Sequence, residues 1–335
     1  MRKPVVLSVV LSLVSLAGPL VPSSSGEERP AVDLTQVETW MTELSNWGRW
    51  GKDDRLGALN LITPEKRKAA AALVRDGVAV SLAHDVLETA SADNPTPFEH
   101  TMTAHGGAEN PSSYAMDKYA VAYHGFAQTH VDALCHVFHK GKMYNGVDRA
   151  TVTAEGCKEL DVTAMRDGVV TRGVLVDIAW LRGVDYLEPA TPIYPEELEA
   201  WEKKTGIRVG PGDALLLRTG RWARRAEKGA WGGTEGAAGL HVSCVPWLKA
   251  RDVAILGSDA GSDVVPSGVE GAAGLFLPVH ELAIVALGVP IIDNADLERA
   301  SLEAQKRGRW EFLFTLAPLR VVGGTGSPAN PIAIF

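Results

Sequence analysis

Three short apolar segments that begin or end with glycine constrain the fold of this chain most strongly. They are GVLVDIAW at 173–180, GDALLLRTG at 212–220 and VAILGSDAG at 253–261. Short apolar runs of this kind are typical of strands that are buried on both faces of a sheet. Helices are predicted around them at 195–205, 245–251 and 279–287. Because strands and helices alternate without a linker, the pattern favours a single α/β domain.

The first half of the chain is less regular. A short helix is predicted at 32–43 and a strand at 78–82. Between them, a second helix is expected to begin with Thr63 as its N-cap and Pro64 in its first turn, and to end at Gly77. Residues 89–117 are rich in Pro, Gly, Ser and Asn and show no periodicity. They predict a long loop, and long loops in compact domains often carry function.

The N-terminal residues have the order of a secretory signal peptide. Arg2 and Lys3 precede an apolar run at 5–20, and small residues follow it. Serine and glycine interrupt the run, which argues against a stable membrane span. We therefore predict a signal peptide at 1–25, cleavage between Ala17 and Gly26, an exported protein, and one domain at 26–335. An uncleaved helix that tethers the chain to a membrane is the alternative.

Composition narrows the class of partner. The net charge of −8 comes from mixed signs along the chain, whereas a nucleic-acid-binding protein would favour a basic face. Three cysteines, Cys135, Cys157 and Cys244, allow at most one internal disulfide. A bridge between Cys157 and Cys244 is one option, and reduced, buried cysteines are the other. With 335 residues, the core is large enough to need no bridge.

Four of the nine histidines lie within residues 123–146. His130 and Asp132 are two residues apart, so on an extended strand they would point to the same face and could bind one ion. Imidazole together with carboxylate suits Zn²⁺ or Mn²⁺. A turn after Asp132 could bring His136 back as a base or a further ligand. Since His-x-Asp is common by chance, a polar loop that is merely rich in histidine remains open.

THVDALCH at 129–136 resembles part of the H-x-G-T-H-x-D-x-x-x-H motif of the cyclase family of metal-dependent hydrolases. That family contains bacterial kynurenine formamidase and isatin hydrolase. Other segments are also similar to the family: NWGRWGKDDRLGALNLITPE, RGVLVDI, GDALLLRTG and VHELAIVALGVPIIDNADL. The resemblance covers roughly residues 45–334. It implies a swivelling β/β/α fold and an arylformamidase-like enzyme that hydrolyses an amide or lactam with the help of a metal ion.

The resemblance also implies roles for particular residues. His130, Asp132 and His280 match metal ligands, and His136 matches the catalytic base or acid. Asp293 stands where the family usually has a glutamate ligand, and its shorter carboxylate could still reach a metal. We therefore expect one divalent ion, Zn²⁺ or Mn²⁺, a small substrate that could be aromatic, and a homo-oligomer, either a dimer or a tetramer.

Two positions depart from the family motif. Phe126 and Gln128 stand where the family has its first histidine and its glycine, and phenylalanine cannot bind a metal. On a straight strand His124 would lie roughly 20 Å from His130. It could therefore replace the missing ligand only if the chain bends, and Gly125 is the candidate for that bend. Gln128 could instead offer a carbonyl oxygen, with Phe126 as an apolar wall of a rearranged site.

Several interpretations stay open at this stage. His241 lies in an apolar turn region, where a structural histidine is favoured over a ligand. Trp47 and Trp50 could stack on an aromatic substrate or belong to the core. The chain could be an exported small-molecule-binding protein that has lost catalysis, or a lactonase or a metal-dependent dehydratase. A serine hydrolase is disfavoured because the sequence has no G-x-S-x-G motif.

Overall fold

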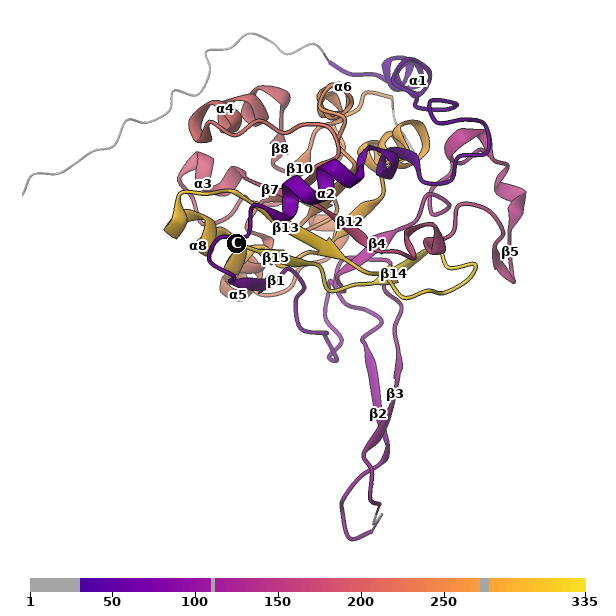
Figure 1. Ribbon diagram of the computed structural model, residues 1–335, viewed down its shortest axis with the longest axis vertical. Helices are drawn as coiled ribbons and strands as arrows, with labels where there is room; N and C mark the ends of the chain where they lie inside the picture. The colour runs from indigo at the N-terminus through magenta and orange to yellow at the C-terminus, as the bar shows by residue number, and fades with distance from the viewer. Residues whose placement is uncertain (1–30, 110–111, 272–276) are drawn as a thin grey trace, which may run out of the picture. The chain divides into compact units, whose positions relative to one another are not determined.

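A nine-stranded mixed sheet forms the centre of the computed structural model, which describes residues 31–109, 112–271 and 277–335 (Figure 1). The order of its strands is β1-β15-β13-β7-β9-β11-β12-β4-β14. Their bounds are β1 Ala79–Ser81, β4 His130–Asp132, β7 Val169–Asp177, β9 Ala214–Arg218, β11 Ile255–Ser258, β12 Ile291–Asp293, β13 Glu311–Leu316, β14 Gly326–Pro328 and β15 Ile332–Ile334. The predicted signal peptide lies outside the described residues. Among those residues, every helix is too short or too polar to cross a membrane.

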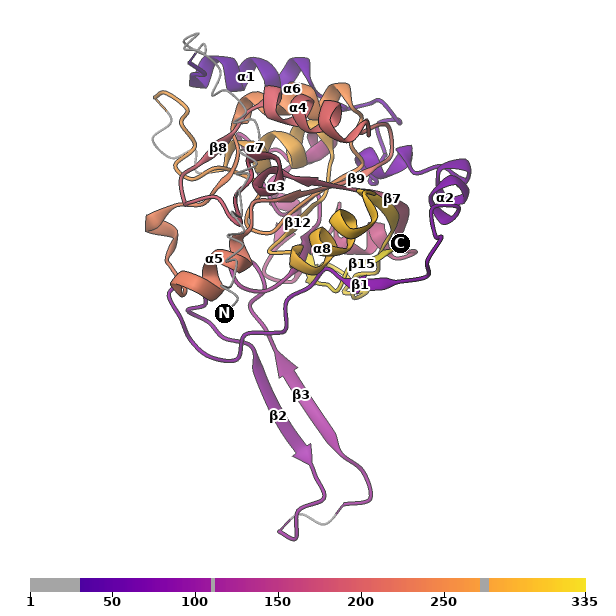
Figure 2. The same cartoon turned by 90° about the vertical axis from the view of Figure 1, so that its left-hand side faces the viewer.

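Helices cover the sheet, and α1, α4 and α6 gather on one side of it (Figure 2). The α-helices are α1 Leu34–Glu43, α2 Pro64–Ala71, α3 Ile178–Arg182, α4 Pro195–Thr205, α5 Arg221–Lys228, α6 Val245–Ala250, α7 Pro278–Glu281 and α8 Glu298–Arg307, and a π-helix, η7, spans Leu282–Leu287. Short 3₁₀ helices are η1 Gly57–Leu61, η2 Tyr144–Gly146, η3 Arg149–Thr151, η4 Val162–Met165, η5 Gly233–Glu235 and η6 Val242–Cys244. Two-stranded ladders pair β5 Val152–Thr153 with β6 Gly156–Cys157 and β8 Pro192–Ile193 with β10 Gly239–Leu240.

The predicted α/β architecture is confirmed. The three apolar segments hold the second half of β7 and all of β9 and β11, which are parallel neighbours, and every residue of β9 and β11 is buried. The first segment runs on into helix α3. Helix α2 begins as expected, because the Thr63 hydroxyl accepts a hydrogen bond from the Lys66 backbone N–H. It ends at Ala71 rather than at Gly77, and turns fill the interval.

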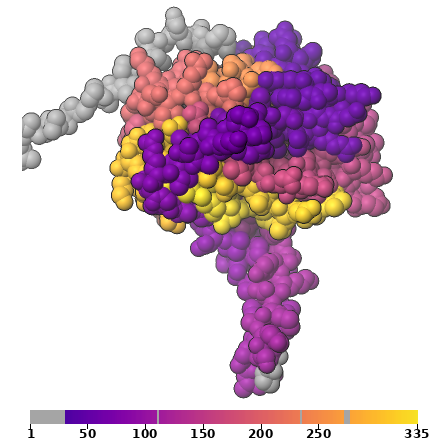
Figure 3. All heavy atoms as spheres, viewed as in Figure 1, coloured from indigo at the N-terminus to yellow at the C-terminus, as the bar shows by residue number. Residues whose placement is uncertain are grey.

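The prediction of a long loop at 89–117 is wrong. The segment contains β2 Glu99–Ala104, which pairs with β3 Met116–Ala120 in an antiparallel hairpin. This hairpin, which we call the arm, extends away from the sheet (Figures 1 and 3). All its strand residues except Ala104 are exposed. Because neither face is buried, the arm lacks the alternation of apolar and polar residues by which a strand is recognised.

The cysteines also differ from the proposed pairing. Cys135 is bonded to Cys157, and their Cα atoms are 6.7 Å apart. Cys244 is free and buried, and its thiol donates to the carbonyl of Ile193. The bridge therefore ties the segment after β4 to the β5–β6 hairpin.

The central strands should dominate stability. Leu216, in β9, is fully buried, whereas Leu302, on α8, is 66% exposed. Leu216→Ala should lower the free energy of unfolding by about 2–5 kcal/mol, because it removes buried methyl groups and leaves a cavity. Leu302→Ala should change it by less than about 0.5 kcal/mol. Urea denaturation of both variants tests this, and equal losses would contradict the burial described here.

Candidate metal centre

Strand β4 places His130 and Asp132 on one face, as their spacing predicts. It lies between β12 and β14, with His130 opposite Asp293. Both β4 residues are almost fully buried. The Nδ1–H of His130 donates to the carbonyl of Gln128 at 2.8 Å. This leaves its Nε2 as a free lone pair, 3.5 Å from Oδ1 of Asp132.

His280, at α7, approaches Asp132 from another element. Its Nδ1 lies 2.5 Å from Oδ2 of Asp263. Its Nε2 lies 3.1 Å from Oδ2 of Asp293 and 4.0 Å from Oδ2 of Asp132. A carboxylate that binds the far nitrogen of a ligand histidine fixes the ring and its tautomer. Asp263 is therefore a supporting residue that the sequence analysis missed, since no motif marks it.

The chain bends at Gly125 and brings His124 into the cluster. Gly125 has φ of +147°, a region that favours glycine. As a result Nδ1 of His124 lies 3.0 Å from Oδ1 of Asp132. Its Nε2 lies 3.0 Å from the hydroxyl of Thr325, and its ring stacks on His136 with centroids 3.9 Å apart. His124 therefore faces Asp132 in this structure, whereas a straight strand would have kept it away.

Two buried polar side chains hold this bend. Nη2 of Arg221 donates to the carbonyl of Phe126 at 2.5 Å. The amide of Asn294 donates to the carbonyls of Gly125 and Gln128, at 2.7 and 3.2 Å. Arg221 also donates to the Asn294 side-chain oxygen. The sequence analysis missed both residues, although Asn294 directly follows the candidate ligand Asp293.

The remaining candidates lie elsewhere. The amide of Gln128 bonds the backbone of Leu87 through both its oxygen and its nitrogen. His241 caps η6, bonds Ser243 and packs against Tyr194. Neither side chain belongs to the groups of donors found among the described residues.

The described residues contain two groups of possible metal donors, and both groups include Asp132. One contains His124, His130 and Asp132, and the other contains Asp132, His280 and Asp293. Both oxygens of Asp132 and Oδ1 of Asp293 are buried without a hydrogen-bond partner. A buried carboxylate in that condition is costly unless a cation satisfies it. The imidazole and carboxylate donors therefore fit a divalent ion such as Zn²⁺ or Mn²⁺.

Electrostatics around the cluster agree with this fit. Burial would raise the pKa of Asp132, but His124 and the neighbouring histidines lower it below its ordinary value. Burial would lower the pKa of His280, but the carboxylates of Asp293 and Asp263 raise it well above its ordinary value. The carboxylates around His280 therefore favour a positive charge at this position, which a proton or a metal ion can supply.

His136, like His124, is only partly buried, whereas His130 and His280 are buried. Its Nε2 lies 4.0 Å from Oδ2 of Asp132. Burial lowers the pKa of His136, although Asp132 acts in the opposite sense. The ring therefore favours its neutral form, which can accept a proton next to the donor cluster.

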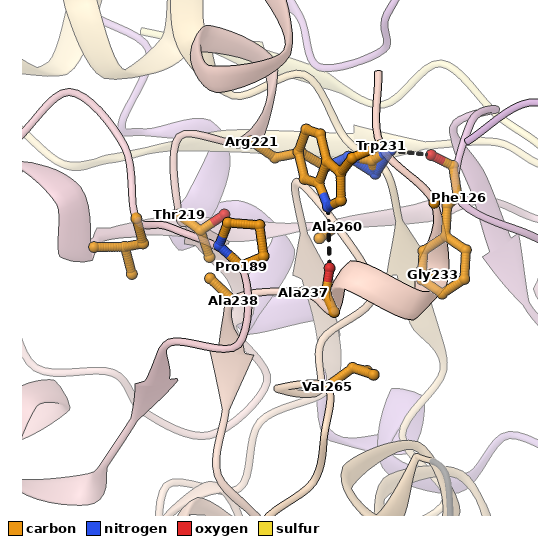
Figure 4. Close-up of a pocket in the computed structure, with 13 residues that line it drawn as sticks. Phe126, Pro189, Thr219, Arg221, Trp231, Gly233, Ala237, Ala238, Ala260 and Val265 are labelled. Atoms are coloured by element: carbon orange, nitrogen blue, oxygen red, sulfur yellow. Dashed lines mark hydrogen bonds between the residues drawn. The ribbon is translucent and has the colours of Figure 1, made fainter. Parts of the chain in front are cut away.

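Phe126 lies between the cluster and an apolar cavity. Gly261 separates its ring from that of His280, since a Cβ placed on Gly261 would lie 3.8 Å from His280 and 3.9 Å from Phe126. On its other side the ring lines a cavity with Trp231, Pro189, Ala237, Ala238 and Val265 (Figure 4). A second cavity runs along residues 92–96 and 122–128 and is lined by both His124 and Phe126. Phe126 is thus an apolar wall beside the site.

Comparison with known proteins decides the family. The profile of the Cyclase family matches residues 32–263. This chain belongs to the Cyclase family. The resemblance recognised in the sequence is thereby confirmed. A search among curated proteins found no match.

Solved structures share the fold. One described as a novel cyclase is 32% identical, with a TM-score of 0.77 over 88% of this chain and 99% of its own. An isatin hydrolase bound to the product analogue thioisatinate is 18% identical, with a TM-score of 0.54 over 80% of this chain and 95% of its own. Isatin hydrolase A from Ralstonia solanacearum is 23% identical, with a TM-score of 0.53 over 81% and 97%.

Asp132 should be essential for metal binding because both donor groups use it. Asp132→Ala should lower metal affinity by at least about 10–100-fold, which is the loss seen when only a supporting residue is removed. The exposed Asp53→Ala serves as the control and should keep normal affinity. Isothermal titration calorimetry with Zn²⁺ or Mn²⁺ measures the metal affinity of both variants. Unchanged affinity in Asp132→Ala would refute the site.

The bend at Gly125 makes a separate prediction. His124→Ala should lower metal affinity by about tenfold or more, since it removes a donor that faces Asp132. Phe126→His with Gln128→Gly should bring no gain, because Arg221 holds the Phe126 backbone and the ring faces the cavity wall. Titration of both variants tests this. A gain in the double variant together with no loss in His124→Ala would reverse the assignment.

Proposed function

We propose that this chain is a metal-dependent hydrolase that cleaves the C–N bond of a small amide or lactam. The observation that carries the proposal is the buried Asp132, whose oxygens make no hydrogen bond and belong to two groups of imidazole and carboxylate donors. Membership of the Cyclase family supports the assignment. The named relatives that are isatin hydrolases agree with a cyclic amide as substrate, although their low identity supports the fold alone.

Asp132 would hold the metal together with His124 and His130, with His280 and Asp293, or with both pairs. A divalent ion, Zn²⁺ or Mn²⁺, supplies a Lewis acid that polarises a carbonyl and lowers the pKa of water. Asp263 and the Gln128 carbonyl orient the His280 and His130 rings through their Nδ1 atoms. The donor nitrogens are thereby aimed at Asp132 before any ligand binds.

His136 is the group that moves the proton. Its neutral ring accepts a proton from the attacking water, and the hydroxide adds to the carbonyl carbon. The imidazolium then gives that proton to the leaving nitrogen as the C–N bond breaks. The half-buried position of His136, next to Asp132, allows both transfers in one place. An amide gives a carboxylic acid and an amine, and a lactam gives one ring-opened molecule that carries both groups. In each case the product atoms are those of the substrate and one water.

A small substituent suits the second cavity, which has a volume of about 260 Å³ and is lined by Tyr123, His124 and Phe126. The cavity beside Trp231 has a volume of about 20 Å³, which is room for little more than one water molecule. Trp47 donates its indole N–H to the carbonyl of Val285, and Trp50 packs against the core. Neither of these tryptophans lines the described cavities next to His124 and Phe126. Support for an aromatic substrate therefore comes from Tyr123 and Phe126, which line the larger cavity, rather than from the N-terminal tryptophans.

His136 should act in catalysis and not in metal binding. His136→Gln should lower kcat by about 10²–10⁴-fold, which is the usual contribution of a general acid–base. Metal content, measured by mass spectrometry of the purified variant, should remain as in the wild type. An activity loss that follows metal loss in parallel would make His136 a ligand instead.

The substrate class needs a panel of aromatic amides, lactams and lactones. The proposal predicts hydrolysis of an amide or lactam that disappears after chelation and returns when metal is restored. Preference for lactones would point to a lactonase. A fully metal-loaded protein that binds such compounds and hydrolyses none would support a binding protein without catalysis.

A further inference from the structure

A third cavity, with a volume of about 470 Å³, lies between helices α3, α5 and α8. Helix α3 follows β7 and helix α5 follows β9, so the cavity lies at the carboxyl ends of these two parallel strands. Ligands of α/β proteins commonly bind outside the carboxyl ends of such strands. The third cavity shares no lining residue with the two cavities beside Phe126. Its volume suits a small organic ligand, and its position separates it from the metal centre.

The floor of the third cavity holds a buried guanidinium between two carboxylates. Arg218, the last residue of β9, is only 6% exposed. Its Nη1 donates to both oxygens of Asp177, at 3.1 and 3.2 Å, and its Nη2 donates to Oε2 of Glu298 at 2.6 Å. Asp185 and Glu227 add two further carboxylates to the lining, whereas Arg218 is the one cation among the described lining residues. The electrostatic potential of the cavity therefore favours a positively charged ligand.

Two polar atoms of this floor have no partner among the described residues. Oε1 of Glu298 and Nε of Arg218 are both buried and make no hydrogen bond. Buried polar atoms in that condition are costly, and they often mark the place of a water, an ion or a ligand. Burial raises the pKa of Glu298, so a cation beside its carboxylate would stabilise the charged form. Glu298 thus requires a cationic donor, and Arg218 requires an acceptor.

Apolar side chains form the mouth of the third cavity. Val184 is 47% exposed and Leu302 is 66% exposed, and both line the cavity. Trp180 lines it too, but its ring already packs against Trp310 and lies under the ammonium of Lys204. A hydrocarbon group of a ligand could therefore cover Val184 and Leu302, whereas the Trp180 ring is taken.

The donors of this cavity do not suit a metal ion. Among the described residues, neither group of possible metal donors contains Glu298 or Asp177. The guanidinium of Arg218 occupies the space between these two carboxylates and would repel a metal ion. A single ion would also leave most of the cavity unfilled, so the chemistry favours an organic cation.

We propose that the third cavity binds a small organic molecule that carries an ammonium group and a neighbouring neutral oxygen, as amino alcohols and amino acid amides do. The ammonium pairs with the carboxylate of Glu298, and the oxygen accepts a hydrogen bond from Nε of Arg218. An aryl or alkyl group of the ligand covers Val184 and Leu302. The proposal does not rest on the hydrolase function, since no residue of the metal centre takes part.

Three matched probes test the two polar contacts. They are 2-amino-2-phenylethanol, 1-phenylethylamine, which lacks the hydroxyl, and 2-phenylethanol, which lacks the ammonium. Isothermal titration calorimetry of the metal-loaded protein should give a dissociation constant below about 1 mM for the first probe. Loss of the ammonium should weaken binding at least about tenfold, and loss of the hydroxyl at least about threefold, because both contacts involve a charged group of the protein.

Variants of the lining locate the site. Glu298→Gln removes the charge but keeps an oxygen for Arg218, and it should weaken binding of 2-amino-2-phenylethanol about tenfold or more. Ala223→Leu fills part of the cavity without touching a charge and should weaken binding to a similar extent. Glu303→Gln is the matched control, because Glu303 lies on the same helix, pairs with Arg307 and does not line the cavity. Circular dichroism confirms that the variants are folded.

Each result either supports or overturns the proposal. Failure of 2-amino-2-phenylethanol to bind at concentrations up to about 10 mM would overturn it. Equal affinity for the three probes, or normal binding in both Glu298→Gln and Ala223→Leu, would do the same. Loss of binding in Asp132→Ala would place the ligand at the metal centre instead. Normal binding in Asp132→Ala would support the third cavity, whether or not the protein hydrolyses amides.

Discussion

The buried carboxylate of Asp132 is the constraint on which the rest of the site depends. Its two oxygens have no hydrogen-bond partner, yet four histidines surround it, so the protein holds a negative charge where water cannot solvate it. Strand β4 can place it there only because β12 and β14 pair with β4 on its two sides. The edge of the central sheet thus fixes the metal centre, and the cavity lined by residues 122–128 lies beside it.

Neighbouring residues orient the histidines that surround the Asp132 carboxylate. Asp263 and the Gln128 carbonyl set the tautomers of His280 and His130, and Arg221 with Asn294 holds the bend that brings in His124. Arg221 is buried where it makes these contacts, and this burial lowers the pKa of its guanidinium. The site therefore depends on backbone carbonyls as much as on the ligand side chains.

The sequence predicted what local patterns encode. Period-two spacing placed His130 and Asp132 on one face, and glycine-bounded apolar runs located the buried strands. It named Gly125 as the place where a bend would bring in His124 but left the bend open, because the bend depends on distant partners. The sequence did not predict the arm, because alternation of apolar and polar residues arises when one face of a strand is buried, and almost no residue of β2 or β3 is buried. His280 and Asp293 were found only through family resemblance, since sequence separation hides their contact with Asp132.

Anomalous diffraction from crystals grown with Mn²⁺ or Zn²⁺ tests the central claim most directly, because it locates the ion without depending on a substrate. The account predicts a peak about 2.0–2.2 Å from an oxygen of Asp132. The same ion should contact His124 and His130, or His280 and Asp293. A peak at another position, with no ion in contact with Asp132 while metal-dependent hydrolysis persists, would contradict it.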